Sequence, residues 1–329
     1  MRVVLCYPME EHHYRQICEA APGAEVVNAG QERIADEILH ADVFCGHAKV
    51  PVPWDEVVAR GRLRWIQSSA AGLDHCLVPA VISSDIVVSS ASGLFADAVA
   101  EQTLALLCGL LRGLPMFFRQ QQSREFVRRP TADLHDARVG IVGLGGNGRR
   151  LADVLSVFRT RIFATDYYPE QKPASVECLW PASALDQLLP LIDILILCLP
   201  LNAQTTGLID GAAMARMRPG SLLINVARGP VVVERDLVAA LETGHLGGAG
   251  VDVTEVEPLP ADSRLWDLPN VIISPHVGAQ SASRTDNTTN LVCENLRRYV
   301  AGQRLWNVVD KQLGFPPPTF IWTPNSGRE

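Results

Sequence analysis

Apolar residues along this chain of 329 residues fall into short runs that alternate with amphipathic stretches. Segments such as EEHHYRQICEAA and ERIADEILHA repeat apolar positions at helical spacing. Between them lie five runs rich in β-branched residues, namely RVVLCY, AEVVNAG, ADVFCGH, LRWIQSSAAG and DIVVSS. Strands that alternate with helices in this way predict βα units and a parallel sheet.

A second series of runs begins after a longer helical segment. The pattern predicts a helix from Asp97 to about Arg119, which Pro115 should kink or end. A polar link then leads to six strand-like runs, namely RVGIVGLG, RIFATD, DILILCLP, SLLINVA, GAGVDV and NVIISPH. Six strands in one doubly wound sheet are what a full dinucleotide-binding domain requires. The Pro- and aromatic-rich end, GFPPPTFIWTPNSGRE, fits neither pattern and is predicted only to be a tail or arm.

Length and composition favour a soluble protein of two domains. A chain of 329 residues suits two domains, and a hydrophobic content of 47% supplies a core for each. The net charge of -7 argues against nucleic acid as the main partner. The N-terminal segment lacks the shape of a signal peptide, and the most apolar segment, LALLCGLLRGL, is too short to span a bilayer. We therefore expect a cytoplasmic protein that binds neither membrane nor nucleic acid.

The cysteines and lysines argue against several kinds of chemistry. Eight cysteines are scattered without a Cys-x-x-Cys pair or the Cys and His spacing of a metal site, so no metal is predicted. We interpret them as small core residues in a reducing compartment. The three lysines, Lys49, Lys172 and Lys311, lie outside the motifs described below, which disfavours a Schiff-base mechanism.

The segment GIVGLGGNGRRLADVL has the glycine spacing of a phosphate-binding turn. Gly143, Gly145 and Gly148 follow a strand-like run and precede a helical one. The first glycine permits a tight turn, the second leaves room for a pyrophosphate, and the third lets helix and strand pack closely. The N–H groups at the helix start would face the phosphates. A glycine-rich bend without ligand is the alternative, and Asn147 stands where such loops often carry an apolar residue.

Asp166 ends the next strand-like run, 18 residues after Gly148. A carboxylate at this point would accept hydrogen bonds from the adenosine ribose hydroxyls and would repel a 2′-phosphate. The position therefore predicts NAD rather than NADP as cofactor, with a cap on the strand end as the alternative.

Three loops after later strand-like runs carry charged or titratable side chains: Arg228, Asp252 with Glu257, and His276. We expect them to converge, because the carboxyl ends of parallel strands line one crevice. An arginine matches a substrate carboxylate, and histidine suits acid–base work because it titrates near neutral pH. Glu257 would favour the charged imidazole, and Asp252 would accept a bond from the nicotinamide amide. Taken singly, the same residues could form only a surface salt bridge or a structural contact.

Together these segments resemble the signature blocks of the D-isomer-specific 2-hydroxyacid dehydrogenases. The similarity lies in VGIVGLGGNGRRLA, DILILCLPLNAQTTGLID, MRPGSLLINVARGPVVVERDLVAAL, GAGVDVTEVEPLPADSRLWDLPNVIISPHVGA and ADAVAEQTLALL. It implies an α/β fold of two doubly wound domains. A Rossmann NAD-binding domain over residues 98–286 would be inserted in a smaller flavodoxin-like substrate domain of residues 1–97 and 287–329.

The resemblance also implies a role for each motif. Arg228, Glu257 and His276 would be catalytic, and the first and last would also bind substrate. The loop SSAAGLDH would bind the substrate carboxylate through backbone N–H groups of Ala70, Ala71, Gly72 and Leu73. The expected cofactor contacts are Gly143, Gly145, Gly146, Asn147, Gly148, Asp166, Leu199, Pro200, Thr205, Val226, Ala227, Arg228, Asp252, His276 and Gly278. Such proteins are usually homodimers built on the nucleotide domains.

The implied reaction is an NAD(H)-dependent hydride transfer between a small 2-oxo acid and its D-2-hydroxy acid, with His276 as acid and base. The formate branch usually has Gln where Glu257 stands, and the loop SSAAGLDH lacks the lysine of the phosphite branch. Glyoxylate or hydroxypyruvate reduction is favoured, because the sequence GLDH resembles that branch, and D-lactate-like or larger 2-oxo acids stay open as substrates. Phosphoglycerate dehydrogenase activity is an alternative, although FCGHAKVP offers only Lys49 where those enzymes tend to place arginine and no chain remains for their regulatory domain. If the protein is not an enzyme, the alternative is an NAD(H)-sensing binding protein of the corepressor type.

Overall fold

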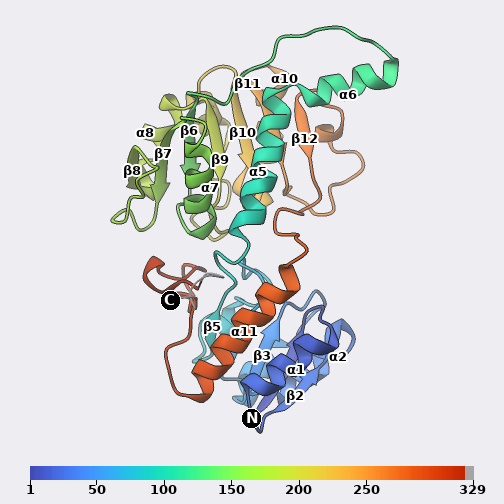
Figure 1. The fold of residues 1–329 in the computed structure, drawn as a ribbon, viewed down its shortest axis with the longest axis vertical. Helices are drawn as coiled ribbons and strands as arrows, with labels where there is room; N and C mark the ends of the chain where they lie inside the picture. The colour runs from blue at the N-terminus through green and yellow to red at the C-terminus, as the bar shows by residue number, and fades with distance from the viewer. Residues whose placement is uncertain (323–329) are drawn as a thin grey trace. The chain divides into compact units, whose positions relative to one another are not determined.

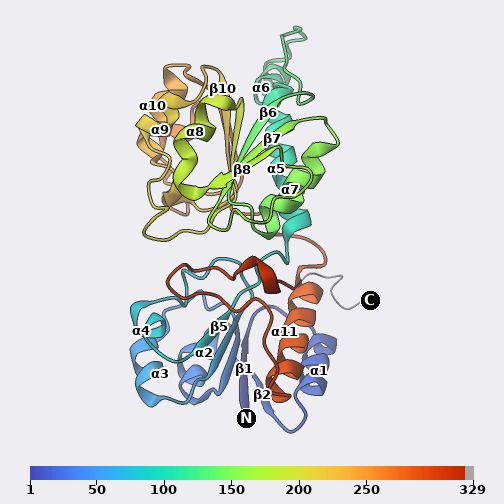
Figure 2. The same cartoon turned by 90° about the vertical axis from the view of Figure 1, so that its left-hand side faces the viewer.

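The computed structural model describes residues 1–322, which form two compact units. The first unit contains Met1–Phe95 and the chain from Ser281 onward, and the second contains Ala96–Gln280. Each has a parallel sheet with helices on both faces (Figures 1 and 2), which confirms the predicted fold class. None of the helices within residues 1–322 is long and apolar enough to cross a membrane.

The sheet of the first unit has the strand order β2-β1-β3-β4-β5, and every neighbouring pair is parallel. This is the order of flavodoxin-like folds. The strands are β1 (Arg2–Cys6), β2 (Glu25–Asn28), β3 (Val43–Gly46), β4 (Trp65–Ser68) and β5 (Val87–Ser89). All five were predicted.

The helices of the first unit cover both faces of this sheet (Figure 2). One layer contains α1 (Glu11–Ala20) and α11 (Arg284–Val300). The other contains α2 (Gly30–Glu37), α3 (Trp54–Arg60) and α4 (Pro79–Ile82). Within β1, Val3 and Leu5 belong to the core under α1 and α11, whereas Val4 belongs to the core of the opposite face. Burial on both faces explains why the strand-like runs are continuously apolar.

The sheet of the second unit has seven parallel strands in the order β12-β11-β10-β9-β6-β7-β8, one more than the six predicted. The extra strand is β8, at the edge, a segment of four residues that ends in a proline. The chain order reverses between β6 and β9, where doubly wound folds bind their ligands. The strands are β6 (Arg138–Val142), β7 (Arg161–Asp166), β8 (Cys178–Pro181), β9 (Ile194–Leu197), β10 (Ser221–Asn225), β11 (Leu246–Val251) and β12 (Val271–Ile273).

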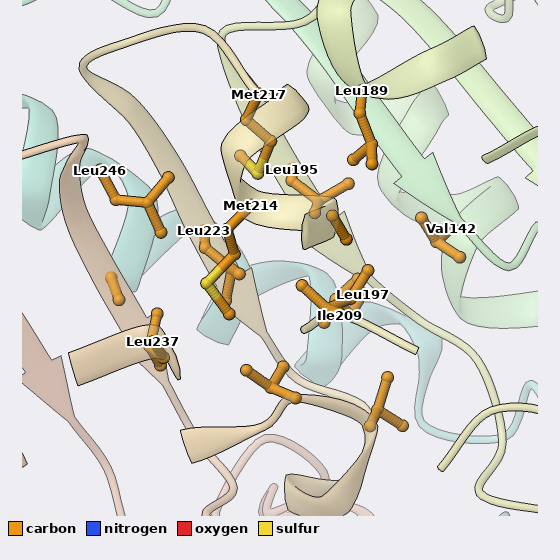
Figure 3. Packing of buried hydrophobic residues seen from close by; sticks show 14 of the residues in the cluster. Val142, Leu189, Leu195, Leu197, Ile209, Met214, Met217, Leu223, Leu237 and Leu246 are labelled. Carbon is orange, nitrogen blue, oxygen red and sulfur yellow. The ribbon is translucent and has the colours of Figure 1, made fainter. Parts of the chain in front are cut away.

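Helices also cover both faces of the second sheet (Figure 2). One layer contains α5 (Ala96–Leu111) and α7 (Gly146–Ser156); the other contains α8 (Leu185–Leu188), α9 (Gly211–Arg216) and α10 (Glu234–Glu242). Figure 3 shows the core of the second layer, where Met214 and Leu237 pack with Leu195 and Leu223 of the strands. Burying such a side chain contributes about 1.5–3 kcal/mol. Short 3₁₀ helices are η1 (Ile38–His40), η2 (Ala182–Ala184), η3 (Leu189–Leu191), η4 (Gly229–Val231), η5 (Arg264–Trp266) and η6 (Pro318–Phe320).

The helix predicted from Asp97 to about Arg119 is in fact two helices. α5 ends at Leu111, and α6 (Leu114–Ser123) begins after Gly113, whose φ is 69°. Pro115 lies in the first turn of α6, where its missing N–H costs no hydrogen bond. The glycine therefore makes the break, and the proline starts the next helix, which leads away from the sheet (Figure 1).

Candidate active site

The predicted loops of the second unit all follow strands at one edge of its sheet. Because its strands are parallel neighbours, their carboxyl ends share this edge. From β12 to β7 in sheet order, the loops carry His276, then Asp252 and Glu257, then Arg228, then residues 198–207, then the glycine turn, and then Asp166. Residues that are up to 133 positions apart, such as Gly143 and His276, thus lie on one edge.

The glycine turn between β6 and α7 has room for a ligand at one glycine and none at the other two. Gly143 has φ 93°, and a Cβ there would lie 2.7 Å from the carbonyl oxygen of Cys198. A Cβ on Gly148 would lie 2.1 Å from the carbonyl oxygen of Gly143. Gly145, the N-cap of the eleven-residue α7, would meet no protein atom within 4 Å. This open space at a helix N-terminus fits the pyrophosphate of a dinucleotide.

Gly146 and Asn147 form the first turn of α7 and are partly buried. Asp166, at the end of β7, is tied to the same turn. Its carboxylate accepts hydrogen bonds from the backbone N–H of Leu144, at 2.6 Å, and of Tyr168, at 2.8 Å. An ionised carboxylate has about four acceptor positions, so it retains capacity for ribose hydroxyls.

The loop after β9 is stabilised by Thr205. Its hydroxyl donates to the carbonyl oxygen of Pro200 at 2.7 Å and accepts from the N–H of Asn202 at 2.9 Å. Leu199 is buried at the start of this loop. The predicted cofactor contacts Leu199, Pro200 and Thr205 therefore lie on a turn that is held by hydrogen bonds of the Thr205 hydroxyl.

The loop after β10 is held by Asn225, a buried residue that the sequence analysis did not single out. Its side-chain oxygen accepts from the N–H of Ala227 at 3.0 Å, and its side-chain nitrogen donates to the carbonyl oxygen of Arg228 at 3.1 Å. Arg228 itself donates from Nη1 to the carbonyl oxygen of Ala227 at 2.7 Å. Val226 is packed against the core below. The polar end of the apolar run SLLIN was the available signal for Asn225.

The next loop packs directly on this one. A Cβ on Gly229 would lie 1.7 Å from the carbonyl oxygen of Thr254, so only glycine fits. The Thr254 N–H donates to Glu257 Oε1 at 3.2 Å. The arginine loop and the glutamate loop are therefore in backbone contact.

His276 and Glu257 form a hydrogen-bonded pair. His276 Nδ1 lies 2.8 Å from Glu257 Oε2, and the two side chains are 45% and 39% exposed. Because an ionised carboxylate can only accept, Nδ1 carries the proton. Nε2 is then the ring nitrogen that can exchange a proton with a ligand.

Asp252 holds the loop that presents His276. Its buried carboxylate accepts from Ser274 Oγ at 2.6 Å and from the N–H groups of Val277, at 3.0 Å, and Gly278, at 2.7 Å. Its carbonyl oxygen accepts from the His276 N–H at 2.7 Å. The structure thus gives Asp252 a positioning role that the sequence analysis missed, while its bond to a nicotinamide amide stays a prediction.

The predicted substrate loop belongs to the first unit, where it follows β4. The Ala70 N–H donates to Ser68 Oγ at 3.0 Å, and the Ala70 carbonyl oxygen accepts from the Ala91 N–H at 2.9 Å. Within residues 1–322, the N–H groups of Ala71, Gly72 and Leu73 donate to no protein acceptor. The structure therefore leaves three backbone donors for an anion on this loop, rather than the four predicted.

The structure also gathers His12, His13 and Asp286, a group of potential metal ligands that no sequence spacing indicated. Their arrangement is that of a helix cap. His13 Nδ1 accepts from the N–H of Glu10 at 3.1 Å, which leaves Nε2 to donate to Asp286 Oδ1 at 2.7 Å. This bond lowers the pKa of the Asp286 carboxyl. The side chains thus join α1 to α11.

Comparison with known proteins places this geometry in context. Residues 104–278 match the model described as D-isomer specific 2-hydroxyacid dehydrogenase, NAD binding domain. The (S)-sulfolactate dehydrogenase of Chromohalobacter salexigens is 37% identical over 238 residues, which cover 72% of this chain and 77% of that protein. The D-3-phosphoglycerate dehydrogenase of Mycobacterium tuberculosis is 30% identical over 83% of this chain, which spans only 52% of that protein.

Solved structures agree with this match. A D-isomer specific 2-hydroxyacid dehydrogenase from Xanthobacter autotrophicus, in complex with NADPH, has a TM-score of 0.81 at 29% identity and covers 95% of this chain and 99% of its own. The NADPH-dependent glyoxylate/hydroxypyruvate reductase of Sinorhizobium meliloti has a TM-score of 0.80 at 27% identity with the same coverage.

Proposed function

The chain belongs to the family of D-isomer specific 2-hydroxyacid dehydrogenases, and on that premise we propose that it reduces a small 2-oxo acid of the glyoxylate or hydroxypyruvate class with NADH. Membership makes it an oxidoreductase that acts on CH–OH donors with a nicotinamide cofactor. The observation that carries the proposal is the pair of His276 and Glu257, 2.8 Å apart, on the sheet edge that also bears the open glycine turn.

The residues of the second unit can perform this reduction. A bound nicotinamide cofactor would supply the hydride, and the glycine turn and Asp166 would hold its pyrophosphate and ribose. The Arg228 guanidinium would bind the substrate carboxylate and polarise the neighbouring carbonyl. His276 would donate its Nε2 proton to the carbonyl oxygen as charge develops there, and Glu257 would stabilise the charged imidazole. We propose that the N–H groups of Ala71, Gly72 and Leu73 on the first unit, which have no protein acceptor among residues 1–322, also bind substrate.

The preference for NADH over NADPH rests on Asp166. Both of its oxygens are fixed by backbone N–H groups, so the carboxylate cannot easily turn away from a 2′-phosphate. A carboxylate and a phosphate at hydrogen-bond distance repel each other, because both are negatively charged. The Xanthobacter structure is a complex with NADPH and the Sinorhizobium reductase is NADPH-dependent, and we propose that this chain differs from them in its preferred cofactor.

The test is NADH oxidation at 340 nm against glyoxylate, hydroxypyruvate, pyruvate, 2-oxobutyrate, 3-phosphohydroxypyruvate and sulfopyruvate. We expect the first two to be turned over best, and His276→Ala to lower kcat by about 10²–10⁴-fold, as general acid–base residues do. NADH affinity should stay close to that of the unaltered protein, because the proton donor acts in the chemical step. His40→Ala, an exposed histidine of the first unit, is the matched control.

Each other result has a clear meaning. Turnover of 3-phosphohydroxypyruvate alone would favour phosphoglycerate dehydrogenase activity over our proposal. Tight NADH binding without turnover of any substrate would favour a sensor. Unchanged kcat in His276→Ala would remove the acid–base role from that residue.

We further propose that the protein is a cytoplasmic homodimer built on the second unit. Four large apolar side chains on α6 and the segment after it are exposed, namely Leu114 (40%), Phe118 (58%), Phe126 (103%) and Val127 (45%). Clustered exposed apolar residues of this size mark interaction surfaces. The free state of all eight cysteines supports a reducing compartment.

A further inference from the structure

Asn307 joins three segments of the first unit. It is fully buried, and its φ of 57° is one that asparagine tolerates. Its side-chain nitrogen donates to the carbonyl oxygens of Ser90, at 3.0 Å, and Ser92, at 3.1 Å. Its side-chain oxygen accepts from the Trp322 N–H at 2.8 Å, and its backbone N–H donates to the Phe320 carbonyl oxygen at 3.2 Å. One side chain thus ties the end of β5 to the C-terminal segment.

The C-terminal strap, defined here as residues 315–322, is fastened by aromatic contacts. The ring of Phe320 stacks on that of Trp306 with centroids 3.8 Å apart and an angle of 11°. Arg304 lies 4.4 Å from the Phe320 ring, and Arg298 lies 4.6 Å from the Trp306 ring. Trp322 is buried. The part of the predicted tail that the structure describes is therefore packed, and residues 323–329 lie outside the described range.

A short path of hydrogen bonds leads from the strap to the candidate substrate loop. Ser90 and Ser92, which Asn307 holds, flank Ala91. The Ala91 N–H donates to the Ala70 carbonyl oxygen at 2.9 Å. Ala70 is the first residue of the loop whose next three N–H groups have no protein acceptor among residues 1–322. The path contains only groups in direct contact.

The strand below the loop has a separate anchor. Buried Gln67 accepts from Asn295 Nδ2 at 2.7 Å and from Ser89 Oγ at 2.8 Å. This network joins β4 and β5 to α11. Asn295 also donates to the Trp306 carbonyl oxygen at 3.1 Å and accepts from the Trp306 N–H at 2.8 Å, but no atom of residues 315–322 takes part in these bonds. Loosening the strap should therefore disturb residues 90–92 and the loop, and leave the sheet in place.

We infer that the C-terminal strap positions the candidate substrate loop Ala70–Leu73 through Asn307. Phe320 and Trp322 are positioning residues in this inference, since they act through other residues. The effect on substrate binding rests on the proposed function, whereas the hold on the loop does not depend on it.

The experiment compares full-length Phe320→Ala and Trp322→Ala with Phe320→Tyr, which keeps the stacked ring, and with Val300→Ala, an exposed apolar control at the end of α11. Amide hydrogen exchange of a peptide covering residues 68–77 is measured without substrate, alongside a peptide covering the glycine turn. KM for the preferred 2-oxo acid, kcat and the NADH affinity are then measured for each variant.

We expect both alanine variants to exchange the loop peptide at least about fivefold faster and to raise KM about three- to tenfold, with kcat and NADH affinity changed less than twofold. Phe320→Tyr and Val300→Ala should behave like the unaltered protein. Unchanged exchange of the loop in both alanine variants would overturn the inference, whatever the activity. Faster exchange with unchanged KM would overturn the link to substrate and the loop's proposed role together. An unaltered protein that turns over no 2-oxo acid would instead overturn the proposed function, and the exchange result would still decide the strap.

Discussion

His276 has φ 53°, in a region that side chains other than asparagine, aspartate and histidine seldom enter. A residue held there typically costs about 1–3 kcal/mol. The bonds that Asp252 accepts from His276, Val277 and Gly278 offset this cost and fix the direction of the ring. The loop therefore holds His276 in an uncommon backbone conformation that fixes where its imidazole lies.

At the scale of a single charge, we propose that the Asp166 carboxylate sets the preference for NADH over NADPH. Asp166→Asn keeps one oxygen acceptor and removes the negative charge. We expect the preference for NADH over NADPH, measured as the ratio of kcat/KM values, to fall by about tenfold or more, which corresponds to about 1.4 kcal/mol. Steady-state kinetics with both cofactors measure it, with Asp153→Asn on the exposed face of α7 as control. A protein that already prefers NADPH before any substitution would contradict the argument.

The buried thiols should be unreactive in the folded protein. Burial raises the pKa of Cys6 and Cys293 to about 11 and that of Cys76 to about 12, and it also raises the pKa of Cys45. At pH 8 less than about 1% of each is the reactive thiolate. Titration with Ellman's reagent should therefore modify at most four thiols rapidly in the native protein and all eight in guanidinium chloride. Eight rapid equivalents under native conditions would show that these cysteines are not core residues.

At the scale of elements, substitutions at two glycines of the turn between β6 and α7 should distinguish an effect on NADH binding from an effect on stability. Gly145→Ala places its Cβ where no protein atom lies within 4 Å, whereas Gly148→Ala places it 2.1 Å from a backbone oxygen. We expect the first variant to weaken NADH binding by about tenfold or more with Tm within about 2 °C of the original. The second should also destabilise the fold by about 1–3 kcal/mol, the usual cost of overpacking. Fluorescence titration with NADH and thermal unfolding of both variants provide the comparison. Equal NADH affinity in Gly145→Ala would place the phosphates elsewhere.

The strand and helix pattern was predictable wherever an element is long and buried, as for β1, β6 and β9. It failed at β8, because its apolar run of three residues is too short to indicate a strand and ends at an exposed proline. It also failed at the break between α5 and α6, because Pro115 was the more obvious breaker while Gly113 takes the left-handed conformation.

The candidate site shows a similar limit. Its charged residues could be predicted from the ends of strands, since parallel topology collects them at one edge. The supporting contacts could not, because Asn225 and Asn307 act through buried bonds to backbone groups that no periodicity encodes. For the same reason the aromatic end of the chain gave no sequence signal of its packing.

At the scale of the whole molecule, the exposed phenylalanines of the α6 region test the proposed dimer. Phe126→Asp should convert the dimer to a monomer, because a carboxylate in place of a ring cannot be buried in an apolar interface without a large cost. Size-exclusion chromatography with light scattering measures the mass. Val157→Asp is the control, since Val157 is 79% exposed at the end of α7 in the same unit. A monomer before substitution, or a dimer that survives Phe126→Asp, would contradict the proposed interface.

The second unit is one uninterrupted stretch, Ala96–Gln280, and it carries the glycine turn, Asp166, Arg228, Glu257 and His276. The candidate substrate loop and its strap lie on the chain that enters and leaves this stretch. Recombination at two crossover points, near residues 95 and 280, would exchange all the proposed cofactor-binding and proton-transfer residues together. Mutations in the flanking chain could then change the substrate specificity while the reaction is retained. In this way one ancestral gene can give rise to many specificities.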